Sequence, residues 1–156
     1  MMDDPPCSIE RALCVVGERW TFLVLREALV GRTRFAEFRD ALGVAPDVLS
    51  DRLNTLVDYG VLAREPYQEP GRRTRHAYRI TPAGGELAVV LGALQQWGDQ
   101  HLPRPSGPTM LRRRRGTDEP LHVAFVGADG REVPLADAEE IRTAAHPANA
   151  APPATR

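Results

Sequence analysis

Apolar residues recur with the period of an α-helix along the first hundred residues. The spacing predicts five helices, over residues 8–16, 20–30, 34–42, 46–59 and 82–101. The second is apolar on nearly all sides, which is typical of a helix at the centre of a core. Thr33 and Thr81 suit helix N-caps, and Gly43 and Gly60 suit helix ends. We therefore predict a mainly helical domain.

Two stretches between the fourth and fifth helices have the pattern of β-strands. They cover residues 61–67 and 74–80, and Pro70-Gly71 between them marks a turn. The two preceding helices are joined by residues 43–45 alone, which is the spacing of a helix-turn-helix. A helix-turn-helix followed by a hairpin with an arginine-rich tip predicts a winged helix, in the α+β class.

The composition changes after residue 102, where prolines and glycines become frequent. We predict a linker over residues 103–120 that contains the basic run 112–115. A small hairpin extension is expected over residues 121–143, because Asp129-Gly130 is a good turn. The predicted organisation begins with an N-terminal arm at residues 1–6 and a winged domain at residues 7–102. The linker at 103–120 and the extension at 121–143 follow, and residues 144–156 form a disordered tail.

The distribution of charge and the absence of catalytic motifs limit the functions that the sequence allows. The net charge is −1 and all 20 basic residues are arginine, yet residues 64–79 hold five arginines against two glutamates, a local charge of +3. No apolar run approaches the roughly 20 residues that span a bilayer, and the acidic N-terminus does not resemble a signal peptide. With scattered histidines and no nucleophile or phosphate-loop motif, we predict a cytoplasmic protein that is no enzyme, needs no metal or cofactor and has no membrane partner.

Several ordered segments resemble the HxlR-type family of bacterial regulators, relatives of MarR within the winged-helix group. They are CSIERAL at 7–13, GERWT at 17–21, LRE at 25–27, RFAEF at 34–38, LSDRL at 49–53, GVL at 60–62, YRITPAG at 78–84 and QWGD at 96–99. The resemblance implies a homodimeric DNA-binding regulator, usually a repressor, whose first and last helices form the dimer interface. It also implies that some members sense electrophiles or oxidants through the cysteine that matches Cys7, which many relatives follow with proline where this chain has Ser8.

The polar face of helix 46–59 is expected to contact base edges and phosphates of a pseudo-palindromic operator. The wing at 68–75 is expected to grip phosphates or the minor groove. The candidate DNA-binding residues are Arg34, Asp47, Ser50, Asp51, Arg52, Asn54, Arg72, Arg73 and Arg75. The alternative is a winged-helix module that binds protein partners, with these residues on an ordinary solvated surface.

Apolar residues of the first and last helices are expected to meet a second subunit, namely Ile9, Leu13, Val16, Leu87, Val90, Leu91, Leu94 and Trp97. The aromatic residues Trp20, Phe35, Phe38, Tyr78 and Trp97 are expected in the core rather than around an effector cavity.

Cys7 is the candidate redox sensor, because the helix N-terminus and Arg11 favour a thiolate, although Asp3 and Asp4 oppose it. Cys14 is expected in the core. Seven helical residues place the two Cα atoms about 10 Å apart, too far for a disulfide within this helix. The candidate effector is an electrophile that reacts with Cys7, or a small molecule bound between the dimer helices.

Overall fold

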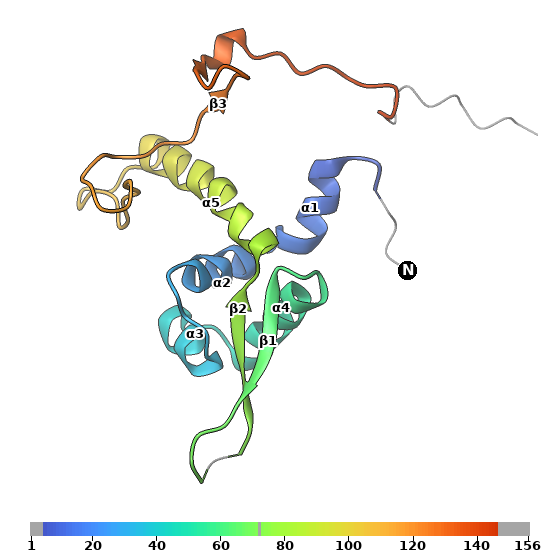
Figure 1. Cartoon of the computed structure of the whole chain (residues 1–156), viewed down its shortest axis with the longest axis vertical. Coiled ribbons are helices and arrows are strands. Elements are labelled where there is room, and N and C mark those ends of the chain that lie inside the picture. Colours follow the sequence, from blue (N-terminus) through green and yellow to red (C-terminus); the bar gives the residue numbers. More distant parts are fainter. Residues whose placement is uncertain (1–4, 72, 147–156) are drawn as a thin grey trace, which may run out of the picture. The chain divides into compact units, whose positions relative to one another are not determined.

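The computed structural model describes residues 5–71 and 73–146 (Figure 1). In chain order the elements are α1 Ser8–Val16, α2 Arg19–Leu29, α3 Phe35–Leu42, α4 Pro46–Asp58, β1 Leu62–Tyr67, β2 Arg75–Ile80, α5 Pro82–His101, β3 Phe125–Val126, β4 Glu132–Val133 and the short 3-10 helix Leu135–Asp137. The mainly helical α+β class is confirmed, and the bounds predicted for the first hundred residues differ by at most one residue. Residues 19–123 form one compact unit, and the remaining segments are described on their own.

The core of this unit forms around α2, which packs against α3, α4, α5 and β2. Its fully buried side chains come from several elements, and the largest are Phe38, Leu25, Leu49, Leu53, Leu56, Leu62 and Val24. Each such side chain contributes about 1.5–3 kcal/mol relative to exposure. The prediction that α2 is central because it is apolar on nearly all sides is confirmed.

The aromatic residues divide between core and surface. Phe38 and Tyr78 are buried as predicted, while Trp20 and Phe35 are half-buried. Trp97 is 57% exposed, so its predicted core position is wrong. The reason is that α5 runs beyond α2, and its last turns have little of the core to pack against (Figure 1).

The turn between α3 and α4 is fixed by a glycine and by apolar burial. Gly43 has φ +60° and its N–H donates to the carbonyl of Arg39 at 2.8 Å, which ends α3. Pro46 opens α4 after the N-cap residue Ala45. Val44 and Leu49 occupy the positions of a hydrophobic staple and both are buried. The entry angle of α4 is thereby held by side chains on either side of its first turn.

The start of α3 differs from the prediction, because Arg34 rather than Thr33 is the N-cap residue. The carboxylate of Glu37 accepts hydrogen bonds from the backbone N–H groups of Thr33 and Arg34, both at 2.9 Å. Thr33 is instead part of an extended segment, since its carbonyl accepts the N–H of Tyr78 at 2.7 Å. Its pairing partner lies far away in the sequence, so local pattern gave no sign of it.

The wing is the antiparallel hairpin β1–β2, with Leu62 opposite Ile80 and Tyr67 opposite Arg75. A strand with one buried face buries every second residue, but the neighbouring residues Ala77 and Tyr78 are both buried. Arg34 forms a β-bridge with Ala77, and α3 packs against β2. This extra cover on β2 explains why simple alternation fails there.

Residues 109–123, here called the strap, fold back on α5. The N–H of Leu121 donates to the carbonyl of Arg112 at 2.8 Å, and that of Arg114 to Glu119 at 2.9 Å. The Gln96 side chain exchanges two hydrogen bonds with the backbone of Val123, at 2.9 and 3.1 Å. This part of the chain, expected as a linker, is fastened to the helix by side-chain amides.

The C-terminal hairpin β3–β4 pairs Phe125 with Val133 and Val126 with Glu132. Its turn lies at Asp129-Gly130 as predicted, with φ +78° at Gly130. The strands are shorter than expected, because only two residues on each side pair. Within the described part of the chain, no helix is long and apolar enough to cross a membrane.

The N-terminus of α5 is tied to the turn that precedes β1. Thr81 caps α5 as predicted, since its hydroxyl accepts the N–H of Gly84 at 3.1 Å. The same hydroxyl lies 2.7 Å from the carbonyl oxygen of Gly60. A Cβ on Gly84 would lie 2.2 Å from the carbonyl oxygen of Val61, whereas a Cβ on Gly85 would meet nothing within 4 Å. Only a glycine fits at position 84.

We therefore expect Gly84→Ala and Gly85→Ala to have opposite effects on thermal unfolding. Gly84→Ala should destabilise the protein by about 1–3 kcal/mol, because backbone must move to admit the methyl group. Gly85→Ala should be neutral or stabilising by up to about 1 kcal/mol, since alanine is the better helix former. Calorimetry of both variants tests this, and equal melting temperatures would show that α5 does not depend on the close approach at Gly84.

Candidate nucleic-acid interface

Helix α4 presents a polar face opposite its buried leucines. Leu49, Leu53 and Leu56 are fully buried at helical spacing, so the intervening side chains lie on the other side. Asp47, Asp51 and Asn54 are exposed and Ser50 is half-buried. The structure thus brings four predicted contact residues onto one accessible surface of the second helix of the helix-turn-helix. That surface holds hydrogen-bonding groups of the kind that contact base edges.

The charge of α4 itself is negative. It contains Arg52 against Asp47, Asp51 and Asp58, which gives 1 − 3 = −2. A helix of this charge does not attract phosphates on its own. Any attraction to a nucleic-acid backbone must come from arginines on neighbouring elements.

Arg52 lies half-buried rather than fully outward as expected. Its Nε atom is buried and has no hydrogen-bond partner among the described residues. An unpaired buried donor of this kind costs about 1–3 kcal/mol. Because Nε is one of the three guanidinium nitrogens, its burial limits the directions in which the group can point.

The wing supplies the positive charge. Arg64, Arg73 and Arg75 are exposed, and none forms an ion pair with another described residue. Arg79 is different, because its Nε lies 2.6 Å from a carboxylate oxygen of Glu65. The β1–β2 hairpin projects beyond the helices of its unit (Figure 1). Arg64 was counted in the local charge of the sequence but was not chosen as a contact residue, and Arg72 lies outside the described residues.

Arg34, another predicted contact residue, is already engaged within the fold. Its Nη1 atom lies 3.0 Å from a carboxylate oxygen of Glu69 in the wing. Its guanidinium carbon also lies 4.9 Å from the centre of the Tyr67 ring. Arg34 therefore links the start of α3 to the far end of β1 and the turn that follows it, a contact that joins residues 35 apart in the sequence.

Two glutamates hold the segment that connects α2 to α3. Backbone N–H groups of Arg34 and Thr33 lower the pKa of Glu37 from its ordinary value of 4.5. Burial raises the pKa of Glu27, but hydrogen bonds from Arg32 and Arg26 lower it by more, so that it also lies below the ordinary value. The Arg32 and Glu27 side chains approach to 2.6 Å. Sequence reasoning did not single out Glu27, although its partners Arg26 and Arg32 lie one and five residues away. What the pattern of residues did not show is that this glutamate is buried.

Apolar side chains are exposed on α5 and on α1, each taken by itself. On α5, Val90, Leu94 and Trp97 are exposed, while Leu87 and Leu91 are half-buried. On α1, Ile9 and Leu13 are exposed, whereas Val16 is buried within the single chain. An exposed apolar face of this extent is typical of an interaction surface.

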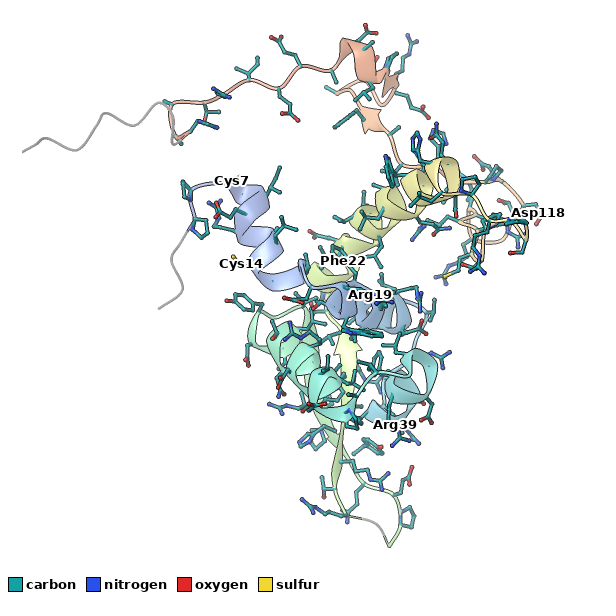
Figure 2. All side chains as sticks on the ribbon, turned by 180° about the vertical axis from the view of Figure 1, so that it is seen from behind. Cys7, Cys14, Arg19, Phe22, Arg39 and Asp118 are labelled. Carbon is teal, nitrogen blue, oxygen red and sulfur yellow. The ribbon has the colours of Figure 1, made fainter. Side chains whose placement is uncertain are left out.

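Both thiols are free and exposed (Figure 2). Cys7 is the N-cap residue of α1, but its side chain makes no capping hydrogen bond. Arg11, which we expected to support a thiolate, donates to the carbonyls of Pro5 and Pro6 and to the hydroxyl of Ser8 instead. The predicted core position of Cys14 is wrong, because Val16 is the one residue of this short helix that is buried.

The fold and this surface define a winged helix-turn-helix transcription regulator. Residues 15–106 match the HxlR-like helix-turn-helix family, and the chain belongs to that family. An uncharacterized HTH-type transcriptional regulator of Mycobacterium bovis is 46% identical over 112 residues, which cover 72% of this chain and 70% of that protein. Family and homologues are transcriptional regulators rather than enzymes, as the sequence predicted.

Solved structures agree with this assignment. The crystal structure of PA1607, described as a candidate transcription factor, has a TM-score of 0.77 and 31% identity, and the match covers 90% of this chain and 97% of that one. The likeness therefore extends beyond the family match at residue 106. The redox regulator HypR in its oxidized form has a TM-score of 0.55 and 26% identity, covering 61% of this chain and 97% of that one.

Proposed function

We propose that this protein is a homodimeric transcriptional repressor that binds a pseudo-palindromic operator through α4 and the β1–β2 wing, including residues 68–75. The observation that carries the proposal is the pairing of a polar, accessible α4 with a projecting hairpin whose Arg64, Arg73 and Arg75 have no acidic partner in the described chain. The planar guanidinium group of arginine donates hydrogen bonds in a geometry that matches phosphate groups. A dimer places two such helices about one turn of DNA apart, which a pseudo-palindrome matches.

The two elements contribute differently in this proposal. The negative charge of α4 opposes close approach to DNA, so the wing supplies the salt-dependent attraction. Exposed Asn54 and half-buried Ser50 then donate to or accept from base edges, and Asp47 and Asp51 accept from cytosine amino groups. Arg52, with its direction restricted by the buried Nε, reaches a guanine or a phosphate. In this proposal the side chains of α4 distinguish one DNA sequence from another, and the wing arginines supply most of the affinity for the DNA backbone.

Substitutions on α4 and on the wing should therefore affect DNA binding in different ways. We expect Arg52→Ala to weaken operator binding by roughly 5–150-fold, the equivalent of about 1–3 kcal/mol, and binding to random DNA by less. The double change Arg73→Ala and Arg75→Ala should weaken both and reduce the salt slope by about 1 for each phosphate that is no longer neutralised. Operator fragments are first selected from host genomic DNA with the intact protein, and binding is titrated at two salt concentrations.

Arg142→Ala is the matched control, because it removes one exposed arginine outside the winged domain. Thermal melting of each variant separates weaker DNA binding from a folding defect, which matters most for half-buried Arg52. Operator affinity that is unchanged in Arg52→Ala contradicts the role of α4. An unchanged salt slope in the double variant shows that the wing is an ordinary solvated hairpin.

The second candidate function is a winged-helix module for protein partners. The observation in its favour is the charge of −2 on α4, together with the net charge of −1 for the chain. Such a module should bind DNA without a steep dependence on salt, or not at all. The salt titration of the unmodified protein therefore distinguishes the two functions.

The homodimer is supported by the exposed apolar residues of α5 and α1. Trp97 is 57% exposed and Leu94 is 53% exposed, which is unfavourable for side chains of this size unless another surface covers them. The double change Leu94→Glu and Trp97→Glu should shift the protein from dimer to monomer in analytical ultracentrifugation. Leu135→Glu is the control, since Leu135 is 78% exposed outside this face. A wild-type protein that stays monomeric at micromolar concentration rejects the dimer.

Thiol control through Cys7 is supported by the exposure of its side chain and by the likeness to a redox regulator. Cys14 lies on the same helix and is exposed as well, so it is a matched control. We expect hypochlorite or a quinone to release DNA from the wild type and from Cys14→Ser, but not from Cys7→Ser. Gel-shift titration measures this, and release that does not depend on Cys7 excludes the sensor role.

A further inference from the structure

A cavity of about 500 Å³ lies between α2, α5 and the strap. Its walls are mainly apolar and include Phe22 and Leu29 of α2, Leu91 and Leu94 of α5, and Leu111 of the strap. Figure 2 labels Phe22 on α2, close to α5. This volume and lining are those of a site for a small organic molecule.

The charged side chains that line the cavity are positive. Arg26 and Arg112 both line it, and no acidic residue is among the described residues that do. Arg26 is already compensated, because its Nη2 atom lies 2.7 Å from a carboxylate oxygen of Glu27. The charge of Arg112 has no such partner in the part of the chain that the structure describes.

Arg112 differs from the next two arginines of the basic run. Arg113 and Arg114 form ion pairs with Asp118 and Glu119 on the outside of the strap. Arg112 is half-buried, and its Nη1 atom donates to the neutral side-chain amide of Gln95. Gln95 in turn donates to the carbonyl of Met110 at 2.6 Å. The strap therefore holds a partly desolvated guanidinium beside an apolar cavity. A positive charge in such surroundings is unfavourable unless a negative charge is paired with it.

We infer that this cavity binds an amphipathic monocarboxylate, with the apolar body between α2 and α5 and the carboxylate on Arg112. A guanidinium donates two parallel hydrogen bonds to a carboxylate, which gives both affinity and orientation. A second cavity of about 700 Å³ shares Gln95 and Arg112 with the first, but Asp99 and Asp118 line it and repel an anion. The ligand therefore lies on the α2 side.

A ligand in this position touches the element that supports the helix-turn-helix. Phe22 and Leu29 belong to α2, and α2 packs directly against α3 and α4. A change in the position of α2 is thus transmitted to the polar face of α4 without an intermediate element. This regulatory consequence rests on the proposed function, whereas the binding of the acid does not.

The test uses the full chain and two probes of similar shape, 4-phenylbutyrate and its neutral amide, in isothermal titration calorimetry and thermal melting without DNA. We expect the acid to bind saturably and raise the melting temperature, and the amide to bind much more weakly. Arg112→Gln should weaken binding of the acid by about tenfold or more. Arg114→Gln is the matched control, because it removes a neighbouring arginine that does not line the cavity, and it should bind as the wild type does.

Ala88→Phe provides a second variant, because Ala88 lines the cavity and a larger side chain there should fill it and abolish binding. Equal binding of acid and amide, equal binding by Arg112→Gln, or no binding of the acid at millimolar concentration would overturn the inference. The last result is also expected if a second copy of the chain fills the cavity. A protein that binds the acid but never binds DNA would contradict the proposed function and leave the ligand site intact.

Discussion

The burial of α2 between the other elements is the constraint on which the rest of the winged domain depends. Val24 and Leu25 are fully buried, and the helix contacts α3, α4, α5 and β2. Because one short helix serves four neighbours, the orientation of α4 and the root of the wing are set by packing against a common element. Close-packed interiors transmit small displacements rather than absorb them. A surface site on α4 is thus mechanically connected to whatever contacts α2.

Polar contacts then determine where the wing stands relative to the helix-turn-helix. Glu37 holds the segment at residues 33–34 through two backbone N–H groups, and this segment pairs with β2. Arg34 reaches from the same point to Glu69 and Tyr67. Each of these contacts contributes little to the free energy of folding, because most of them are exposed to solvent. Together they join the start of α3, the first helix of the helix-turn-helix, to the wing.

The distribution of arginines separates three roles that a total charge of −1 conceals. The wing arginines that have no acidic partner among the described residues suit phosphates. Arginines such as Arg32 and Arg79 are neutralised within the fold. Arg112 belongs to neither group, since it is half-buried beside an apolar cavity with an amide as its partner. Ion pairing in the tertiary structure, rather than the number of arginines, decides which side chains remain available to a ligand.

The sequence by itself determined the helices, the turn at Gly43, the wing and the Thr81 cap, because these depend on periodicity and on residues within one or two turns of each other. It also placed Asp47, Asp51 and Asn54 opposite the buried leucines of α4. Only the tertiary structure decided that Ala77 is buried, that Arg34 is engaged by Glu69, that Arg52 is half-buried and that Trp97 and Cys14 are exposed. Each of these depends on a partner distant in the sequence, or on the lack of one, and local pattern contains no information about such partners.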